Sequence, residues 1–249
     1  MSEDLIVAIA DGVCEVQIAR PQTKNSFLAS TYADLRALLE QVDADDAVSV
    51  VLVYGQGGNF SSGNELGDFL ENPPTSAQSI AIRFMHTLHR FTKPLIAAVD
   101  GFAVGIGTTM LLHCDIVYAT ESAKFLMPFV NLAVVPEAAS TLLLPERAGL
   151  RLASELLYFA EAFDTEVAER AGLVSRIVPR DELLPFARKR AALLASKPVV
   201  AVRETKKLLR QDPTGAIAER IDQEAEIFCK MLQEPPAQAA IRRFLNKKK

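Results

Sequence analysis

The chain has 249 residues, 49% of them hydrophobic and 23% charged, so it can bury one large core with or without an appended region. A net charge of −4 argues against the basic surface that nucleic-acid-binding proteins carry. No apolar run reaches the ~18 residues needed to span a bilayer, and the first residues lack the basic and apolar regions of a signal peptide. We therefore expect a cytoplasmic protein without nucleic-acid or membrane partners.

The cysteines and histidines form no recognisable disulfide or metal pattern. Cys14, Cys114 and Cys229 are odd in number, widely spaced and without a Cys-x-x-Cys motif. His86 and His89 lie three residues apart on one predicted helix, but no third ligand has a matching spacing. We expect neither a disulfide framework nor a metal site.

The first predicted elements are a hairpin and a helix. Two short apolar runs, 5–9 and 13–18, flank Asp11-Gly12, a dipeptide typical of tight turns between strands. In the helix that follows, Thr31 and Asp34 fit a capping pattern, and apolar residues recur behind them at helical spacing.

Strands and helices then alternate along the chain. The predicted strands are apolar runs bounded by turn residues: 48–54, 95–99 and 115–119. The predicted helices between them carry apolar residues on one face: 80–91 and 105–113. This order predicts an α/β architecture.

Helices dominate after about residue 138. Pro198 opens one helix, Asp212-Pro213 opens another, and Pro235-Pro236 is expected to end the second. Both helices have wide apolar faces, which either fold back on the body or bind a second subunit, and the sequence leaves both possibilities open. Arg242-Arg243 and Lys247–Lys249 are expected to form a solvated tail.

The Gly105-Ile106-Gly107 turn joins the predicted strand 95–99 to the predicted helix 105–113. It lacks the third glycine of a dinucleotide-binding fingerprint, and Gly58–Gly63 has P-loop spacing without the Lys-Ser/Thr that must follow. What remains is a strand-to-helix turn, where unpaired N–H groups at the positive end of a helix dipole can stabilise an anion. Close packing of turn and helix is the simpler local explanation of the glycines.

A second glycine turn, Ser61–Leu66, follows the buried strand 48–54. On local grounds it is a polar turn that caps the next segment. Alternatively, it offers a second N–H donor near the first glycine turn. Two donors directed at one thioester oxygen make an oxyanion hole, in which losing one donor typically costs ~10²–10³ in rate.

Glu137 also has two interpretations. It follows Pro136 and precedes small residues, so it fits the first turn of a helix, where acidic residues are favoured. Its apolar neighbours Leu132, Val134 and Val135 would instead desolvate the carboxyl group and raise its pKa towards the range of a general base.

Four segments together resemble the crotonase (enoyl-CoA hydratase/isomerase) superfamily, and the resemblance extends over nearly the whole chain. They are Arg20-Pro21 with Lys24-Asn25, Phe60–Leu66, Lys93–Asp115 and Ala171–Val174. The resemblance implies an α/β fold, a crotonase-like spiral of ββα units over residues 1–196. It also implies a C-terminal helical oligomerisation region over residues 197–249, which assembles homotrimers or hexamers.

The resemblance further implies a site for an acyl-CoA thioester, with CoA as part of the substrate and no other cofactor. In this family two backbone N–H groups form the oxyanion hole, and the matching residues are Asn64 and Ile106. Lys24 matches a contact for the CoA nucleotide. The residues expected to bind substrate are Lys24, Ser62, Asn64, Glu65, Leu66, Ile106 and Phe129.

The departures from the family pattern concern the acids. Hydratases of this family have catalytic glutamates where this chain has Thr109 and Phe129. Glu137 stands where the Δ3,Δ2-enoyl-CoA isomerases have their single base, which implies a one-base isomerase of fatty acid metabolism. The alternatives are another crotonase enzyme, either an enoyl-CoA hydratase or a thioester hydrolase, and a catalytically silent acyl-CoA-binding protein.

Overall fold

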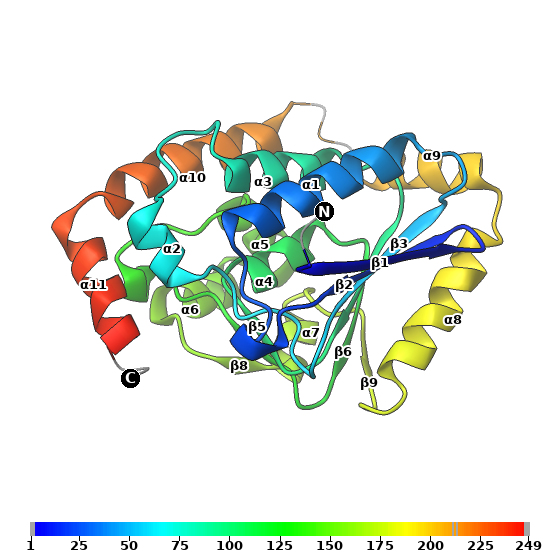
Figure 1. Ribbon diagram of the computed structural model, residues 1–249, viewed down its shortest axis with the longest axis horizontal. Helices are drawn as coiled ribbons and strands as arrows, with labels where there is room; N and C mark the ends of the chain where they lie inside the picture. The colour runs from blue at the N-terminus through cyan, green and yellow to red at the C-terminus, as the bar shows by residue number, and fades with distance from the viewer. Residues whose placement is uncertain (1–2, 211, 213, 247–249) are drawn as a thin grey trace.

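A six-stranded sheet forms the centre of the computed structural model, which describes residues 3–210, 212 and 214–246 (Figure 1). Its strands lie in the order β1-β2-β3-β4-β6-β9. The first two are antiparallel and the others parallel. Their bounds are β1 (Leu5–Ala10), β2 (Val13–Ile18), β3 (Val50–Gly55), β4 (Leu95–Val99), β6 (Ile116–Thr120) and β9 (Arg176–Val178). The predicted hairpin is confirmed, since Asp11 and Gly12 both have positive φ and join β1 to β2.

Where the chain leaves the large sheet, it forms strands of a second, three-stranded sheet. Its strands, in the order β5-β7-β8, are β5 (Phe102–Val104), β7 (Lys124–Leu126) and β8 (Phe163–Asp164). β5 directly follows β4, and β7 directly follows β6, so two successive units each place one strand in each sheet. The predicted strand 115–119 is thus β6, the first strand of such a unit.

Helices cover both faces of the large sheet. On one face, α1 (Ala29–Ala44) and α3 (Ile80–Arg90) pack on the main core, which includes Val51, Val53 and Ala97. On the other face, α8 (Leu183–Ala195) covers a second cluster that includes Leu52 and Ile96. Successive residues of a strand point to opposite faces, so the continuous apolar runs of β3 and β4 serve both cores.

The helices before α8, apart from α1 and α3, are short. They are α2 (Leu66–Glu71), α4 (Ile106–Thr109), α5 (Ser140–Ala148), α6 (Leu150–Phe159) and α7 (Thr165–Arg170), with 3₁₀ turns at Pro21–Thr23, Met110–His113 and Val130–Leu132. The predicted helix 105–113 is therefore one α-helical turn followed by a 3₁₀ turn. Thr31 is not the N-cap of α1, as the capping pattern suggested. It lies two residues inside the helix, and its hydroxyl accepts from the Leu28 N–H at 3.2 Å.

Three helices form the C-terminal part: α9 (Val199–Leu209), α10 (Ala216–Leu232) and α11 (Pro235–Asn246). α10 buries Ile221, Phe228 and Leu232 in the main core, so its apolar face folds back on the body. α9 instead leaves Val200 and Leu209 about four-fifths exposed, at 75% and 81%. One predicted face thus has an intramolecular partner and the other does not, among the residues that the structure describes.

Two expectations about the C-terminus are wrong. Pro235-Pro236 begins α11 rather than ending α10, because a proline fits the first turn of a helix, where its missing N–H is not needed. Arg242-Arg243 lie within α11 and not in a tail. Lys247–Lys249 lie outside the described residues. Within the described part, no helix combines the length and apolar composition that crossing a membrane requires.

Candidate active site

The two glycine turns predicted to offer N–H donors are packed against each other. A Cβ atom at Gly63, where φ is +82°, would lie 2.6 Å from the Val104 carbonyl oxygen. A Cβ atom at Gly107 would lie 2.9 Å from the Ser61 carbonyl oxygen. Only glycine allows this backbone approach. The Val104 N–H also donates to the Ser61 carbonyl at 2.9 Å, so the close packing is real and brings Asn64 beside Ile106.

The N–H groups of Asn64 and Ile106 have no acceptor among the described residues. Phe27 donates to the Gly63 carbonyl at 2.8 Å and accepts from the Glu65 N–H at 2.9 Å, so the Asn64 N–H points away from Phe27. Ile106 is the first residue of α4, and its N–H is one of the unpaired donors at that helix end. Two free donors on adjacent turns have the composition of an oxyanion hole.

Tyr32 holds the side chain of Asn64. The Tyr32 hydroxyl donates to Asn64 Oδ1, and the tyrosine is 2% exposed. Its ring packs edge-on against Phe27 and Phe84, with centroids 5.2 and 5.5 Å away. Tyr32 belongs to the apolar residues that recur at helical spacing in the first predicted helix, and nothing local indicates that its hydroxyl reaches Asn64 in the turn Ser61–Leu66.

Glu137 is buried, at 4% exposure, and its Oε1 has no hydrogen-bond partner within the described part of the chain. Burial raises the pKa of Glu137 from 4.5 to about 8, and the charge of Glu224 adds to the increase. The helix α5 begins at Ser140, so Glu137 lies ahead of the helix and not in its first turn. The interpretation as a desolvated carboxyl is therefore the correct one.

The loop that carries Glu137 has a strained backbone, and a hydrogen bond from His113 supports it. Ala138 and Ala139 both have left-handed backbone conformations, with φ of 61° and 54°, which is costly for residues other than glycine. His113 Nε2 lies 2.8 Å from the Ala138 carbonyl oxygen. Burial lowers the pKa of His113 to about 3, so the ring is neutral and Nε2 must carry the proton that it donates. His113 thus helps to fix the backbone next to Glu137.

A cavity of about 730 Å³ opens beside the two glycine turns. Six predicted site residues line it: Lys24, Ser62, Asn64, Glu65, Leu66 and Phe129. Ile106 and Glu137 do not line it, but their chain neighbours Gly105 and Val134 do. The Gly105-Ile106 turn therefore lies at the wall of this cavity. Glu137 is linked to the other donor through Tyr32, which bonds Asn64 and whose pKa is raised by burial and by the charge of Glu137.

The mouth and the far wall of this cavity come from distant parts of the chain. Lys24 is exposed, and its Nζ lies 4.6 Å from the centroid of the Phe102 ring. Phe228 of α10, together with Ile241 and Arg243 of α11, lines the opposite side. Sequence reasoning missed α11, because a short segment with two prolines at its start and basic residues near its end resembles a tail.

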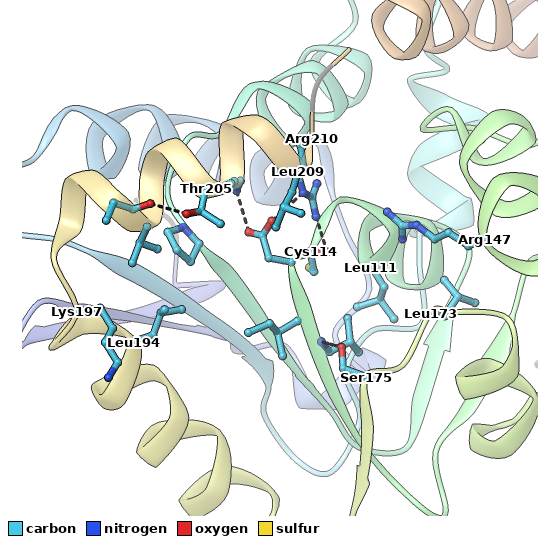
Figure 2. Close-up of a pocket in the computed structure, with 18 of the residues that line it drawn as sticks. Leu111, Cys114, Arg147, Leu173, Ser175, Leu194, Lys197, Thr205, Leu209 and Arg210 are labelled. Carbon is cyan, nitrogen blue, oxygen red and sulfur yellow. Dashed lines mark hydrogen bonds and ion pairs between the residues drawn. The ribbon is translucent and has the colours of Figure 1, made fainter. Parts of the chain in front are cut away.

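A second cavity of about 690 Å³ lies between α9 and the segment Cys114–Val117, which leads into β6 (Figure 2). Its acidic residue is paired: Asp115 accepts from Lys206 Nζ at 2.8 Å and from Arg210 Nε at 2.7 Å. Arg210 also reaches the Cys114 carbonyl at 2.6 Å, as the close-up shows. None of the predicted site residues lies in this cavity.

The cysteines and histidines add no further site. All three cysteines are free and buried. Across residues 3–210, 212 and 214–246, no group of three or more histidine, cysteine, aspartate or glutamate side chains could hold a metal ion. His86 and His89 instead lie 2.8 and 3.6 Å from Asp222 and Asp212.

Comparison with known proteins identifies the family. The profile of the family described as Enoyl-CoA hydratase/isomerase matches residues 8–249. The chain is 31% identical to the 2,3-dehydroadipyl-CoA hydratase of Escherichia coli, over 100% of this chain and 97% of that protein. It is 32% identical to the Enoyl-CoA delta isomerase 2 of Rattus norvegicus, over 85% of this chain but only 55% of that longer protein.

The solved structures agree with the sequence relatives. The structure of OdaA from Pseudomonas aeruginosa superposes with a TM-score of 0.94 at 38% identity, over 98% of this chain and 99% of that one. The predicted crotonase fold is thereby confirmed. The relatives include both hydratases and isomerases, so the family does not by itself select the reaction. The chain belongs to the enoyl-CoA hydratase/isomerase family and is an acyl-CoA enzyme of the crotonase superfamily.

Proposed function

We propose that the protein is a Δ3,Δ2-enoyl-CoA isomerase that moves a double bond in fatty acyl-CoA, with Glu137 as its single acid–base group. One observation carries the proposal: a buried carboxyl group with a raised pKa of about 8 and an oxygen unpaired among the described residues lies close enough to Tyr32 to act on it electrostatically, and Tyr32 bonds Asn64, one of the two residues whose N–H groups are free in the described part of the chain. Thr109 and Phe129 stand where hydratases of the family have acids, and neither can activate water.

The proposed reaction uses the donors and the base in turn. The thioester oxygen of a 3-enoyl-CoA accepts hydrogen bonds from the N–H groups of Asn64 and Ile106. Glu137 removes a proton from C2, and the resulting dienolate is stabilised by the two donors. The protonated Glu137 then returns the proton at C4. One residue suffices, because the acid formed in the first step is the donor needed in the second, and a pKa near 8 suits both directions.

The cavity has the character that the substrate requires. Its inner part is apolar, lined by residues such as Phe69, Phe129 and Phe228, which suits an acyl chain. Lys24 and Phe102 lie together at the mouth, where a cation and an exposed ring suit the nucleotide of CoA. The chemistry needs no metal or redox cofactor, since no electrons are transferred and the oxyanion is held by N–H groups.

The proposal includes a homotrimer or hexamer in the cytoplasm, with residues 197–249 as the assembling region. Support comes from α9, whose Val200, Leu208 and Leu209 are exposed on the protomer, and an exposed apolar patch often marks an association site.

A hydratase is the second candidate. The E. coli relative that aligns over the full length of this chain is named a hydratase. In that case Glu137 would activate water in place of the two acids that this chain lacks. The hydrolase and the silent acyl-CoA-binding protein differ from both in releasing free CoA or in binding without turnover.

The test compares wild type with Glu137→Gln on 3-enoyl-CoA substrates of several chain lengths. We expect the variant to lose at least about 10³-fold in kcat, because general acid–base catalysis typically contributes 10²–10⁴-fold and here one group serves both steps. Binding of a saturated acyl-CoA should be nearly unchanged. Glu226→Gln, which removes an exposed carboxyl group from α10, is the control and should keep full activity.

The products separate the alternatives. Isomerisation gives 2-enoyl-CoA, hydration of a 2-enoyl-CoA gives 3-hydroxyacyl-CoA, and hydrolysis gives free CoA. Full isomerase activity in Glu137→Gln would refute the proposal, as would 3-hydroxyacyl-CoA or free CoA as the main product of the wild type. Tight binding with no turnover of any substrate would favour the silent protein.

A further inference from the structure

Buried side-chain atoms without hydrogen-bond partners among the described residues are concentrated around Glu137 and the start of α5. Four buried side-chain atoms lack a hydrogen-bond partner among the residues that the structure describes: His86 Nδ1, Glu137 Oε1, Ser140 Oγ and Glu224 Oε2. Three of them belong to one connected region. The Ser140 N–H donates to the Glu137 carbonyl at 3.1 Å, and the next residue, Thr141, holds Glu224. Such atoms are rare in folded proteins, and a group of three calls for a functional explanation.

Glu224 comes from α10, far from Glu137 in the sequence, and is 4% exposed. Its Oε1 accepts from the Thr141 N–H at 2.9 Å and from the Thr141 hydroxyl at 2.6 Å. Arg220 donates to the same hydroxyl at 3.0 Å. One carboxyl oxygen is thus anchored by an arrangement that favours the ionised form, while the other oxygen is left without a donor.

Glu137 has no such anchor, and this asymmetry decides which carboxyl group ionises first. Burial raises the pKa of Glu224 to about 7, and its interactions with Thr141, with the Ala139 N–H and with the charge of Arg220 limit the increase. For Glu137, burial acts without any compensating donor, and Glu224 is the charge that raises its pKa further. Glu224 therefore becomes anionic first, and its charge makes Glu137 harder to ionise.

Other charged and titratable groups near Glu137 and Glu224 come from α10, α3 and α1 and from His113. From α10 itself come Arg220 and Asp222, and Asp222 is bonded to His86 of α3. His113 donates to the Ala138 carbonyl, and its ring is neutral. Tyr32 of α1 lies near Glu137, whose charge together with burial raises the pKa of the phenol, so Tyr32 stays neutral. Glu224 is the group to which the charge effect on Glu137 is traced.

We propose that Glu224 is a positioning residue that acts through Glu137: its buried negative charge keeps the catalytic carboxylate a strong base towards the C2 proton of the substrate. The inference rests on the proposed one-base reaction. Glu224 itself gains and loses no proton during turnover. The proton moves from C2 to Glu137 and from Glu137 to C4, and the bond order of the substrate shifts between them.

The first test is the pH dependence of kcat/KM in Glu224→Gln, because a glutamine keeps the acceptor for Thr141 but not the charge. We expect the acid limb of the profile to move to lower pH by roughly one unit. The plateau rate should fall by about three- to ten-fold, because a weaker base removes the C2 proton more slowly. A purely structural role would lower activity at every pH without moving the profile.

Matched variants separate charge from structure. Glu226→Gln removes the same charge from the exposed side of α10 and should leave the profile in place. Glu224→Asp restores a carboxylate and should move the profile back towards wild type. If Glu224→Gln does not fold, Glu224→Leu gives an uncharged side chain of similar volume for the same measurement.

The outcomes also distinguish this inference from the proposed function. An unmoved profile in Glu224→Gln, with Glu137→Gln inactive, would overturn the role of Glu224 and leave the one-base reaction standing. An equal shift in Glu226→Gln would overturn it as well, since any charge would then suffice. An active Glu137→Gln would remove the reaction on which the inference rests.

Discussion

Two charged centres of this protein, one around the partly buried Asp115 and one around the buried Glu137, have opposite designs. Asp115 is paired on several sides: Lys206 approaches from α9, Arg210 from the residue that follows α9, and the Leu95 N–H donates at 2.7 Å. Glu137 Oε1, in contrast, has no hydrogen-bond partner among the residues that the structure describes, although Glu137 is more deeply buried than Asp115. Both centres lie beside a cavity of similar size. The two centres therefore differ in whether the carboxyl group has bonded partners, and not in the size of the neighbouring cavity.

Pairing distinguishes a charged group that serves stability from one that is suited to acid–base chemistry. A buried ion that is fully paired stabilises a packing arrangement and has little left to offer a ligand. A buried carboxyl group without partners is unstable as an anion, which is the property that a general base needs. We expect substitutions at the first centre to change stability, and those at the second to change rate and pH dependence.

The largest expected effect on stability is that of Asp115→Asn. Losing this charge leaves Lys206 and Arg210 facing each other without a counter-ion, and burial already lowers the pKa of Lys206. We expect a loss of about 3 kcal/mol in the free energy of unfolding, measured by denaturant titration, with the kcat of the folded enzyme nearly unchanged.

Asp100→Asn is the matched control for this prediction. The Asp100 side chain is exposed to the same extent as Asp115, 19%, but its partner Arg180 is 68% exposed. A surface pair of this kind contributes at most about 1 kcal/mol. Equal losses in the two variants would contradict the distinction between the centres.

The next effect is on the pH dependence of stability. The pKa of Glu137 is raised from 4.5 to about 8, so between these values the folded protein binds more protons than the unfolded chain, and stability falls as pH rises. His113, with its pKa lowered from 6.5 to about 3, has the opposite effect, but only below pH 6.5. Glu224, with its pKa raised from 4.5 to about 7, acts in the same direction as Glu137, but only up to about pH 7. The effect of Glu137 is therefore best measured from pH 7 to 8.

In this window we expect Glu137→Gln to remove a decrease of at most about 1.4 kcal/mol, which is the limit for one proton over one pH unit. The measurement is the free energy of unfolding at several pH values. Glu226→Gln should keep the wild-type slope. A wild-type slope in Glu137→Gln would mean that this carboxyl group is not the titrating one.

The smallest effect is expected for Tyr32→Phe. The change removes the hydroxyl that donates to Asn64 Oδ1 and leaves the ring packing intact. We expect kcat to fall about ten-fold, because a less well held Asn64 weakens one donor of the oxyanion hole without deleting it. Tyr54→Phe removes a hydroxyl bonded to Glu15, in the cluster on the other face of the sheet, and should not change kcat. A loss of the same size in both variants would show a general effect on packing.

Much of the fold could be predicted because its signals are local. The strand 95–99 has the predicted bounds, since an apolar run between Pro94 and Asp100 can hardly form anything else. The buried state of Glu137 was likewise readable from its apolar neighbours. The C-terminus was misread for the converse reason: whether 235–246 forms a helix depends on what it packs against, and its partners lie in the cavity wall.

The sequence by itself determined the family, the two glycine turns and the position of Glu137, which we propose as the base, because each depends on residue types at short spacing. Only the tertiary structure decided what surrounds them. Tyr32 reaches Asn64, and Glu224 reaches Thr141 from α10, across separations of 32 and 83 residues. The properties of Glu137 depend on burial and on the charge of Glu224. Both are sums over groups brought together by folding, and no local pattern along the chain encodes them.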